Sequence, residues 1–66
     1  MDWLLTLRGM IGDEQAAQAK YAHAADIAET PELEAMFAQL HDEEAVHQRI
    51  LEGWIDFLEK QAKKPA

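Results

Sequence analysis

The chain has 66 residues, no cysteine and a formal net charge of −7, from thirteen acidic and six basic side chains. A chain of this length forms one small domain at most, and the lack of cysteine excludes disulfides, thiolate zinc sites and iron–sulfur clusters. The negative charge argues against nucleic acid as a partner, because phosphate binding needs basic patches, whereas an acidic surface attracts cations. A domain this small buries only about 60% of its unfolded surface, so we expect self-association or a bound metal to complete it.

The first predicted element is a helix over about residues 2–28. Its residues are mostly strong helix formers, and a stripe recurs at the steps of three and four residues that define one helical face. The stripe, in which two members are polar, consists of Leu4, Leu7, Ile11, Glu14, Gln18, Tyr21, Ala25 and Ala28. The apolar N-terminal stretch is interrupted by Thr6, Arg8 and Gly9, so it is too short and too polar for a signal peptide or a membrane span. We therefore expect a soluble, cytoplasmic protein with no membrane partner.

A turn at about residues 29–30 separates this helix from a second one over about residues 31–62. Thr30 suits the N-cap position and Pro31 the first helical position. The second helix carries a heptad seam at alternating steps of four and three, a pattern typical of bundles whose helices pack at shallow angles. This seam consists of Leu33, Phe37, Leu40, Glu44, His47, Leu51, Trp54 and Leu58.

The two helices predict an all-α fold, a single antiparallel two-helix hairpin over residues 1–66. Two rods of roughly 40 and 48 Å that touch along one seam leave much apolar surface uncovered. A second copy is the simplest cover, so we expect the hairpin to dimerise into a four-helix bundle. Trp3 and Trp54 fall at similar heights near the open end, where we expect them to pack together or against the partner. Dimers could also assemble into a ring-like homo-oligomer through an outer stripe that includes Phe57, and the sequence does not decide between a dimer and a ring.

Three charged or ionisable residues stand in the seams at positions where a heptad calls for an apolar residue. Glu44 and His47 are three residues apart, which puts both side chains on one helical face. Glu14 lies about fifteen residues before the turn and Glu44 about fifteen after it, so the two come level in a hairpin. Burying unpaired carboxylates is costly, so we expect a compensating charge at this level.

Two-fold pairing would double this set to four glutamates and two histidines in one bundle core. That is the ligand set of bundle proteins that hold two iron or two manganese ions. Four carboxylates and two divalent ions form a neutral site, and mixed oxygen and imidazole ligands suit iron or manganese, with zinc as a substitute. The sequence therefore predicts two metal ions per dimer. The alternatives are a chance glutamate–histidine pair on a polar stripe, or an ion pair that fixes helix register.

The same residues resemble the ferritin-like superfamily, and the resemblance is close to encapsulated ferritins and rubrerythrins. It covers Glu14 to Leu51. Glu14, followed seven positions later by Tyr21, is similar to the first-helix glutamate and tyrosine of both families, and the run from Asp42 to His47 is similar to their second-helix Glu-x-x-His. The thirty-residue gap between Glu14 and Glu44 fits encapsulated ferritins, in which two subunits share the di-iron site.

The resemblance implies that Glu14, Glu44 and His47 are iron ligands. It also implies that Glu43 supports the opposite histidine and that Tyr21 hydrogen-bonds a ligand carboxylate. Encapsulated ferritins lie inside a protein compartment, so this location is the alternative to the free cytoplasm. The chain departs from these families in three ways. It has few acids around the first-helix ligand, its segment from 61 to 66 is unlike a capsid-docking extension, and it has no cysteine module for electron transfer.

The leading hypothesis is an enzyme, a ferroxidase-type oxidoreductase that binds two iron(II) ions and passes their electrons to oxygen or peroxide. Rubrerythrin-like peroxide reduction is one alternative, although the missing electron-transfer module favours iron oxidation and handling. A metal-stapled dimerisation module without turnover is another, for which zinc would serve as well as iron. A metal-free bundle that binds other proteins is the third. We expect His23 and His41, off the seams, to take no part in the site.

Overall fold

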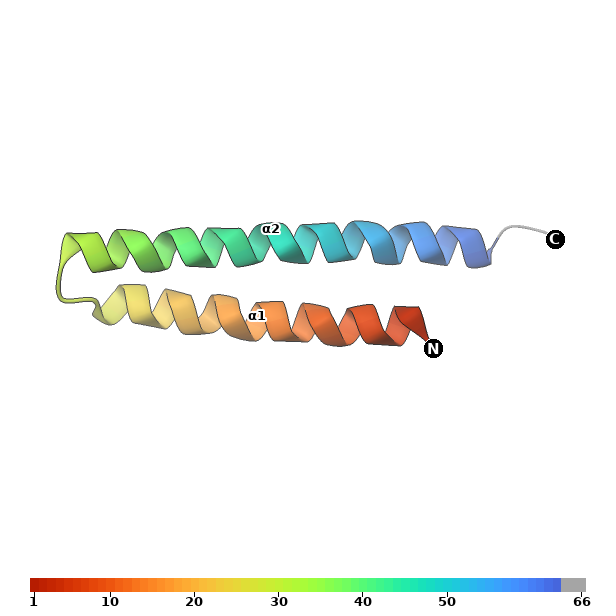
Figure 1. Cartoon of the computed structure of the whole chain (residues 1–66), viewed down its shortest axis with the longest axis horizontal. Coiled ribbons are helices and arrows are strands. Elements are labelled where there is room, and N and C mark those ends of the chain that lie inside the picture. Colours follow the sequence, from red (N-terminus) through yellow and green to blue (C-terminus); the bar gives the residue numbers. More distant parts are fainter. Residues whose placement is uncertain (64–66) are drawn as a thin grey trace.

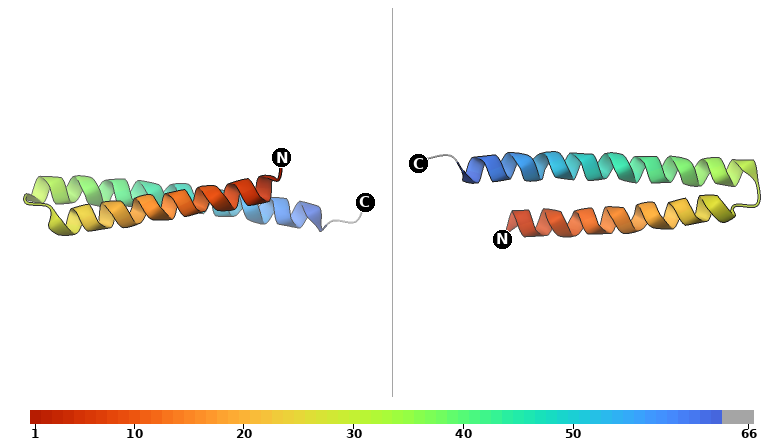
Figure 2. Two further views of the ribbon diagram at one scale, coloured as in Figure 1. Left: turned by 90° about the horizontal axis from the view of Figure 1, so that it is seen from below. Right: turned by 180° about the vertical axis from the view of Figure 1, so that it is seen from behind.

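The computed structural model describes residues 1–63 as two long helices, α1 (Trp3–Ile27) and α2 (Pro31–Ala62). The helices run antiparallel, with the turn at one end and both termini at the other (Figure 1). The described hairpin measures 57 × 15 × 13 Å, and the view from below shows α1 crossing in front of α2 at a shallow angle (Figure 2, left). The predicted all-α hairpin is thereby confirmed. Neither described helix combines the length and the apolar composition that crossing a bilayer requires. Residues 64–66, part of the segment from 61 to 66 considered above, lie outside the described residues.

Local chemistry sets the beginning of each helix. The Asp2 side chain caps α1 by accepting a hydrogen bond from the Leu5 amide at 3.1 Å. The Thr30 hydroxyl caps α2 in the same way, accepting from the Leu33 amide at 3.2 Å, and Pro31 follows in the first turn. These caps satisfy amides that have no partner within the helix. The turn between the helices consists of residues 28–30 only. Because it is so short, α1 and α2 are antiparallel neighbours.

The two helices meet along one half-buried seam, and within residues 1–63 no side chain is fully buried. Tyr21 of α1 stacks with Phe37 of α2 near the turn, with ring centroids 6.5 Å apart. Towards the open end, Arg8 donates to Glu59 at 2.7 Å. This ion pair is exposed, so it contributes only about 0.2–1 kcal/mol. The half-buried seam is consequently the main source of contact between α1 and α2.

Much of the apolar surface of the hairpin remains exposed. Eleven large apolar side chains are at least 42% exposed: Met1, Trp3, Leu5, Met10, Ile27, Leu33, Met36, Val46, Ile50, Trp54 and Phe57. A monomer with such a surface and no buried side chain lacks the core that a small domain needs.

Three members of the predicted α2 seam are exposed in the single hairpin. Leu33 is 43% exposed and Trp54 57% exposed, and the His47 side chain is 54% exposed. A heptad stripe faces the axis of a bundle, and one neighbouring helix covers only half of that stripe. Trp54 packs edge-to-face on Phe57, with ring centroids 5.5 Å apart, and no stacking with Trp3 is present among residues 1–63. Trp3 and Trp54 therefore do not stack on each other within the described hairpin, and packing of these rings against a partner copy stays a prediction.

Candidate metal site

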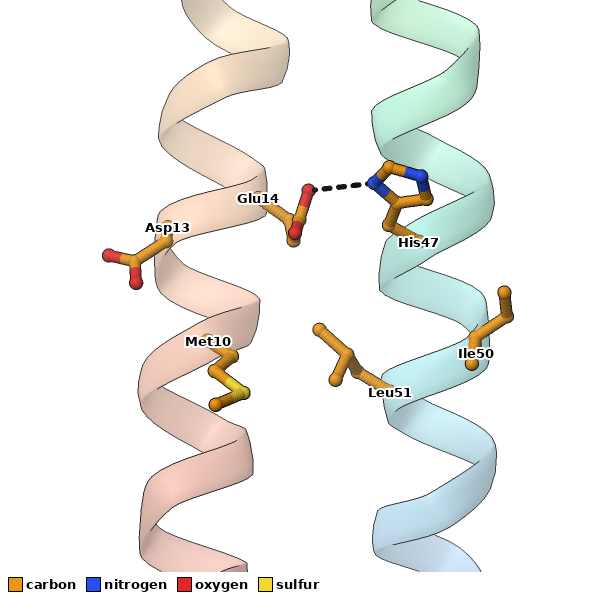
Figure 3. A pocket seen from close by; sticks show the side chains of 6 residues that line it. All are labelled: Met10, Asp13, Glu14, His47, Ile50 and Leu51. Atoms are coloured by element: carbon orange, nitrogen blue, oxygen red, sulfur yellow. Dashed lines mark ion pairs between the residues drawn. The ribbon is translucent and has the colours of Figure 1, made fainter.

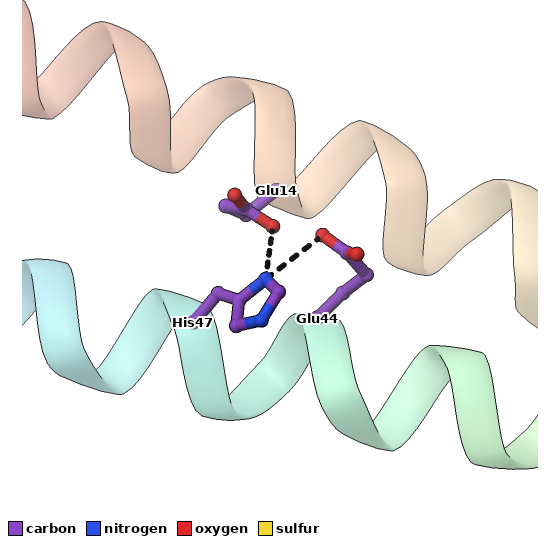
Figure 4. A group of neighbouring side chains, drawn as sticks. All are labelled: Glu14, Glu44 and His47. Atoms are coloured by element: carbon purple, nitrogen blue, oxygen red, sulfur yellow. Dashed lines mark ion pairs between the residues drawn. The ribbon is translucent and has the colours of Figure 1, made fainter.

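The structure brings Glu14, Glu44 and His47 together at one level of the hairpin. Glu14 comes from α1 and the other two from successive turns of α2, and their side chains converge on the space between the helices (Figure 4). The His47 Nδ1 atom lies 3.5 Å from Glu14 Oε2 and 3.7 Å from Glu44 Oε2. One ligand atom from each residue lies within 4.8 Å of the other two. The equal distance of the two glutamates from the turn produces this convergence.

The two carboxylates are much less exposed than the imidazole. The Glu14 and Glu44 side chains are 23% and 21% exposed, whereas His47 is 54% exposed at the rim. The Glu14 Oε2 atom is itself buried and accepts no hydrogen bond within residues 1–63. A buried carboxylate oxygen without a donor loses its hydration and gains nothing in return. The nearest potential donor to this atom is His47 Nδ1 at 3.5 Å, so the oxygen is available to a further positively charged partner.

The donor set fits a divalent metal ion. Two carboxylates and one imidazole are the mixed oxygen and nitrogen ligands that iron, manganese and zinc accept. Ligands on opposite sides of an ion with bonds of about 2.1 Å are about 4.2 Å apart. Small side-chain rotations would therefore bring three atoms that lie within 4.8 Å of one another onto one ion.

The proximity of the two carboxylates changes the ionisation of Glu44. Its pKa is raised above the ordinary value, chiefly because the Glu14 carboxylate can accept a hydrogen bond from protonated Glu44. Partial desolvation and repulsion from the Glu14 charge act in the same direction, and His47 opposes them. The site thus holds more negative charge than its own histidine balances, and a divalent cation would relieve this excess.

The site opens onto an apolar hollow of about 270 Å³ on the His47 flank of the hairpin. Glu14 and His47 form one end of this hollow and face each other, as Figure 3 shows. The hollow is lined by Met10, Asp13, Glu14, His47, Ile50 and Leu51. The flank that carries the exposed imidazole is therefore also the flank with uncovered apolar surface.

The residues predicted to support the ligands make other contacts within the single hairpin. The Tyr21 ring stacks on Phe37, and within residues 1–63 its hydroxyl makes no hydrogen bond to a ligand carboxylate. Glu43 accepts a hydrogen bond from Gln39 at 3.0 Å on the surface of α2. His41 lies 3.1 Å from Asp42 and belongs to no metal-ligand group among these residues. The ligand triad is thus assembled within one hairpin, and the supporting roles of Tyr21 and Glu43, the latter towards the histidine of a second copy, stay predictions.

One residue beside the site had no place in the sequence prediction. Gln48 lies in the seam, where it accepts a hydrogen bond from Gln18 at 2.7 Å. The sequence did contain a signal, because Gln18 follows Glu14 and Gln48 follows Glu44 at the same spacing of four residues.

The chain matches no family profile, no curated protein and no solved structure. Inferences about its function rest on the geometry of the site and on the chemistry of the three converging residues.

Proposed function

We propose that the chain is a di-iron carboxylate protein of the ferroxidase type, in which two copies share one site. Each copy would contribute Glu14, Glu44 and His47. The observation that carries the proposal is the convergence of these three side chains around a buried Glu14 oxygen that has no donor. Carboxylate and imidazole ligands bind iron(II) readily and leave coordination positions free for an oxidant.

The exposed flank supports sharing of the site between two copies. Met10 and Ile50 are 42% and 54% exposed beside the triad, and His47 points into the same open region. A second hairpin on this flank would cover the apolar side chains and bring a second set of three ligands next to the first. The paired set of four carboxylates and two imidazoles would balance the charge of two divalent ions.

In the proposed reaction iron(II) is the substrate and each ion loses one electron. Two electrons and two protons convert oxygen to hydrogen peroxide, or convert hydrogen peroxide to two water molecules. The carboxylates of Glu14 and Glu44 would hold the ions close together and stabilise the higher charge of iron(III). His47 would bind as a neutral imidazole, so its proton must be absent when metal enters. Rubrerythrin-like peroxide reduction would use the same site with an external electron donor.

A structural metal site without turnover is the second candidate. It is favoured by the lack of any fully buried side chain among the described residues, since such a hairpin needs a staple as well as a partner. In that case zinc and iron would stabilise the dimer equally, and bound iron(II) would be oxidised no faster than free iron(II).

Iron oxidation kinetics distinguish the two candidates. Metal-stripped protein is loaded anaerobically with iron(II) and mixed with air-saturated buffer, and the absorbance of iron(III) is recorded. We expect oxidation at least about 100-fold faster than in buffer alone, which is the lower range for one positioned catalytic group. His47→Ala should abolish the acceleration, whereas His23→Ala, a matched exposed histidine on α1, should retain it. Equal rates with and without protein would refute the ferroxidase assignment and leave the structural site.

A further inference from the structure

A hydrogen bond between two glutamines crosses the seam beside the metal ligands. Gln18 Nε2 of α1 donates to Gln48 Oε1 of α2 at 2.7 Å, and both side chains are half-buried. Within residues 1–63 only one other hydrogen bond between side chains joins the helices, the exposed Arg8–Glu59 pair. The glutamine pair is therefore the one side-chain hydrogen bond between α1 and α2 inside the described seam, where the Glu14–His47 ion pair at 3.5 Å also joins the helices.

The glutamines are spaced regularly with respect to the ligands. Gln18 lies one helical turn beyond Glu14 towards the hairpin turn, and Gln48 lies one turn beyond Glu44 away from it. Because these steps run in opposite directions along the hairpin, the Gln18–Gln48 bond runs diagonally across the seam. A diagonal bond of this kind constrains how α1 can rotate or slide against α2.

The neighbouring apolar contacts specify this register poorly. Between the site and the turn, the α1 seam is formed largely by Ala17, Ala24, Ala25 and Ala28. Alanine side chains interdigitate little, so small rotations and slips of the helix change few contacts. A half-buried polar pair is different, because a displacement breaks the bond and leaves the Gln18 amide and the Gln48 oxygen to find other partners, while Gln48 keeps only its weak 3.5 Å bond to Glu52 of the same helix. Single polar pairs inside helical bundles fix register in this way.

We propose that the Gln18–Gln48 hydrogen bond is a positioning device that fixes the register of α1 against α2 and so holds Glu14 within ligand distance of Glu44 and His47. The effect of this hydrogen bond on metal binding rests on the proposed function. Its effect on helix register does not depend on that function, and the two effects can be measured separately.

The test replaces both glutamines with leucine, which has a similar volume and no polar atoms. Gln18→Leu/Gln48→Leu should melt at the same temperature as the wild type or higher, because an apolar pair packs at least as well in a seam. Register is read from the nuclear Overhauser effect between the rings of Tyr21 and Phe37, which stack at 6.5 Å and include the only tyrosine of the chain. We expect this signal to weaken in the double variant.

Metal binding is read in the same samples with cobalt(II), whose visible spectrum reports on coordination. We expect the double variant to bind cobalt(II) about 10- to 100-fold more weakly and with an altered spectrum, the usual effect of losing a group that orients ligands. The control is Gln15→Leu/Gln61→Leu, the same substitution at two exposed positions of the same helices. It should leave both the ring contact and the affinity unchanged.

Two results would each overturn the proposal: an unchanged Tyr21–Phe37 signal in the double variant, or a cobalt(II) affinity and spectrum equal to those of the wild type. If the wild type itself binds no cobalt(II), the proposed metal site fails. The ring contact then decides alone whether the glutamine pair fixes the register.

Discussion

Saturating zinc(II) or iron(II) under anaerobic conditions is expected to raise the melting temperature of metal-stripped protein by about 10–20 °C. Free metal at 100 times its dissociation constant stabilises the folded state by about 2.7 kcal/mol. In a domain of this size, each kcal/mol shifts the melting temperature by roughly 4–8 °C. The effect should be large because the metal-free hairpin has no fully buried side chain among residues 1–63 and keeps a buried Glu14 oxygen without a donor.

Circular dichroism at 222 nm, recorded with metal and again after chelation, measures this shift. His47→Ala should remove most of it, because one of the three converging ligands is lost. His23→Ala should retain it, because His23 is exposed and lies outside the triad. A melting temperature that metal leaves unchanged, or that rises equally in both variants, would contradict a site built from these residues.

Glu44→Gln is expected to stabilise the metal-free protein at pH 7 and to weaken metal binding by more than about 100-fold. The pKa of Glu44 is raised by Glu14, by partial desolvation and by repulsion, so the folded state favours the protonated carboxyl. The protonated Glu44 carboxyl stabilises the folded state. This stabilisation is complete below the ordinary pKa of 4.5 and is lost as the pH rises through the raised pKa of the folded state. At pH 7 the wild type has therefore lost it, whereas an uncharged glutamine keeps the amide next to Glu14 at every pH.

The pH dependence of unfolding provides the measurement. As the pH falls from 7 towards 4.5, metal-free wild type should gain stability relative to Glu44→Gln. Metal-bound wild type should lose stability over the same range, because protons compete with the ion for the carboxylate.

Loss of a supporting group alone weakens metal binding by about 10- to 100-fold, so loss of a direct ligand should exceed that range. Glu34→Gln, which removes an exposed acid in the first turn of α2, is the control for metal binding and should leave the affinity unchanged. Parallel pH profiles for the wild type and Glu44→Gln would show that the two carboxylates do not interact.

The sequence was sufficient to predict the hairpin because its boundaries depend on local chemistry. Thr30 and Pro31 specify where α2 begins, and their preferences arise from the capping bond and from the fixed φ of proline. The level of the site could also be predicted, since Glu14 and Glu44 lie at similar distances from a short turn. Their convergence with His47 follows from helix geometry and requires no knowledge of the packing.

The positions of side chains around the seam could not be predicted in the same way. A heptad stripe defines the face that a helix buries, but it does not say which neighbour covers each half of that face. Leu33 and Trp54 belong to the predicted bundle seam, and both are exposed in the single hairpin. The Gln18–Gln48 bond depends on which residues come level across the seam, and this register is a tertiary property.

Anaerobic iron(II) titration of metal-stripped protein, with the molar mass of the complex determined by sedimentation, shows whether two hairpins share one di-iron site. If two copies share a site of two metals, binding should saturate at about one iron per chain and the iron-loaded species should contain a multiple of two chains. Glu14→Gln should abolish saturable binding while the helical content is retained. The absence of saturable binding, or saturation by a species with the mass of a single chain, would contradict a di-iron site formed between two hairpins.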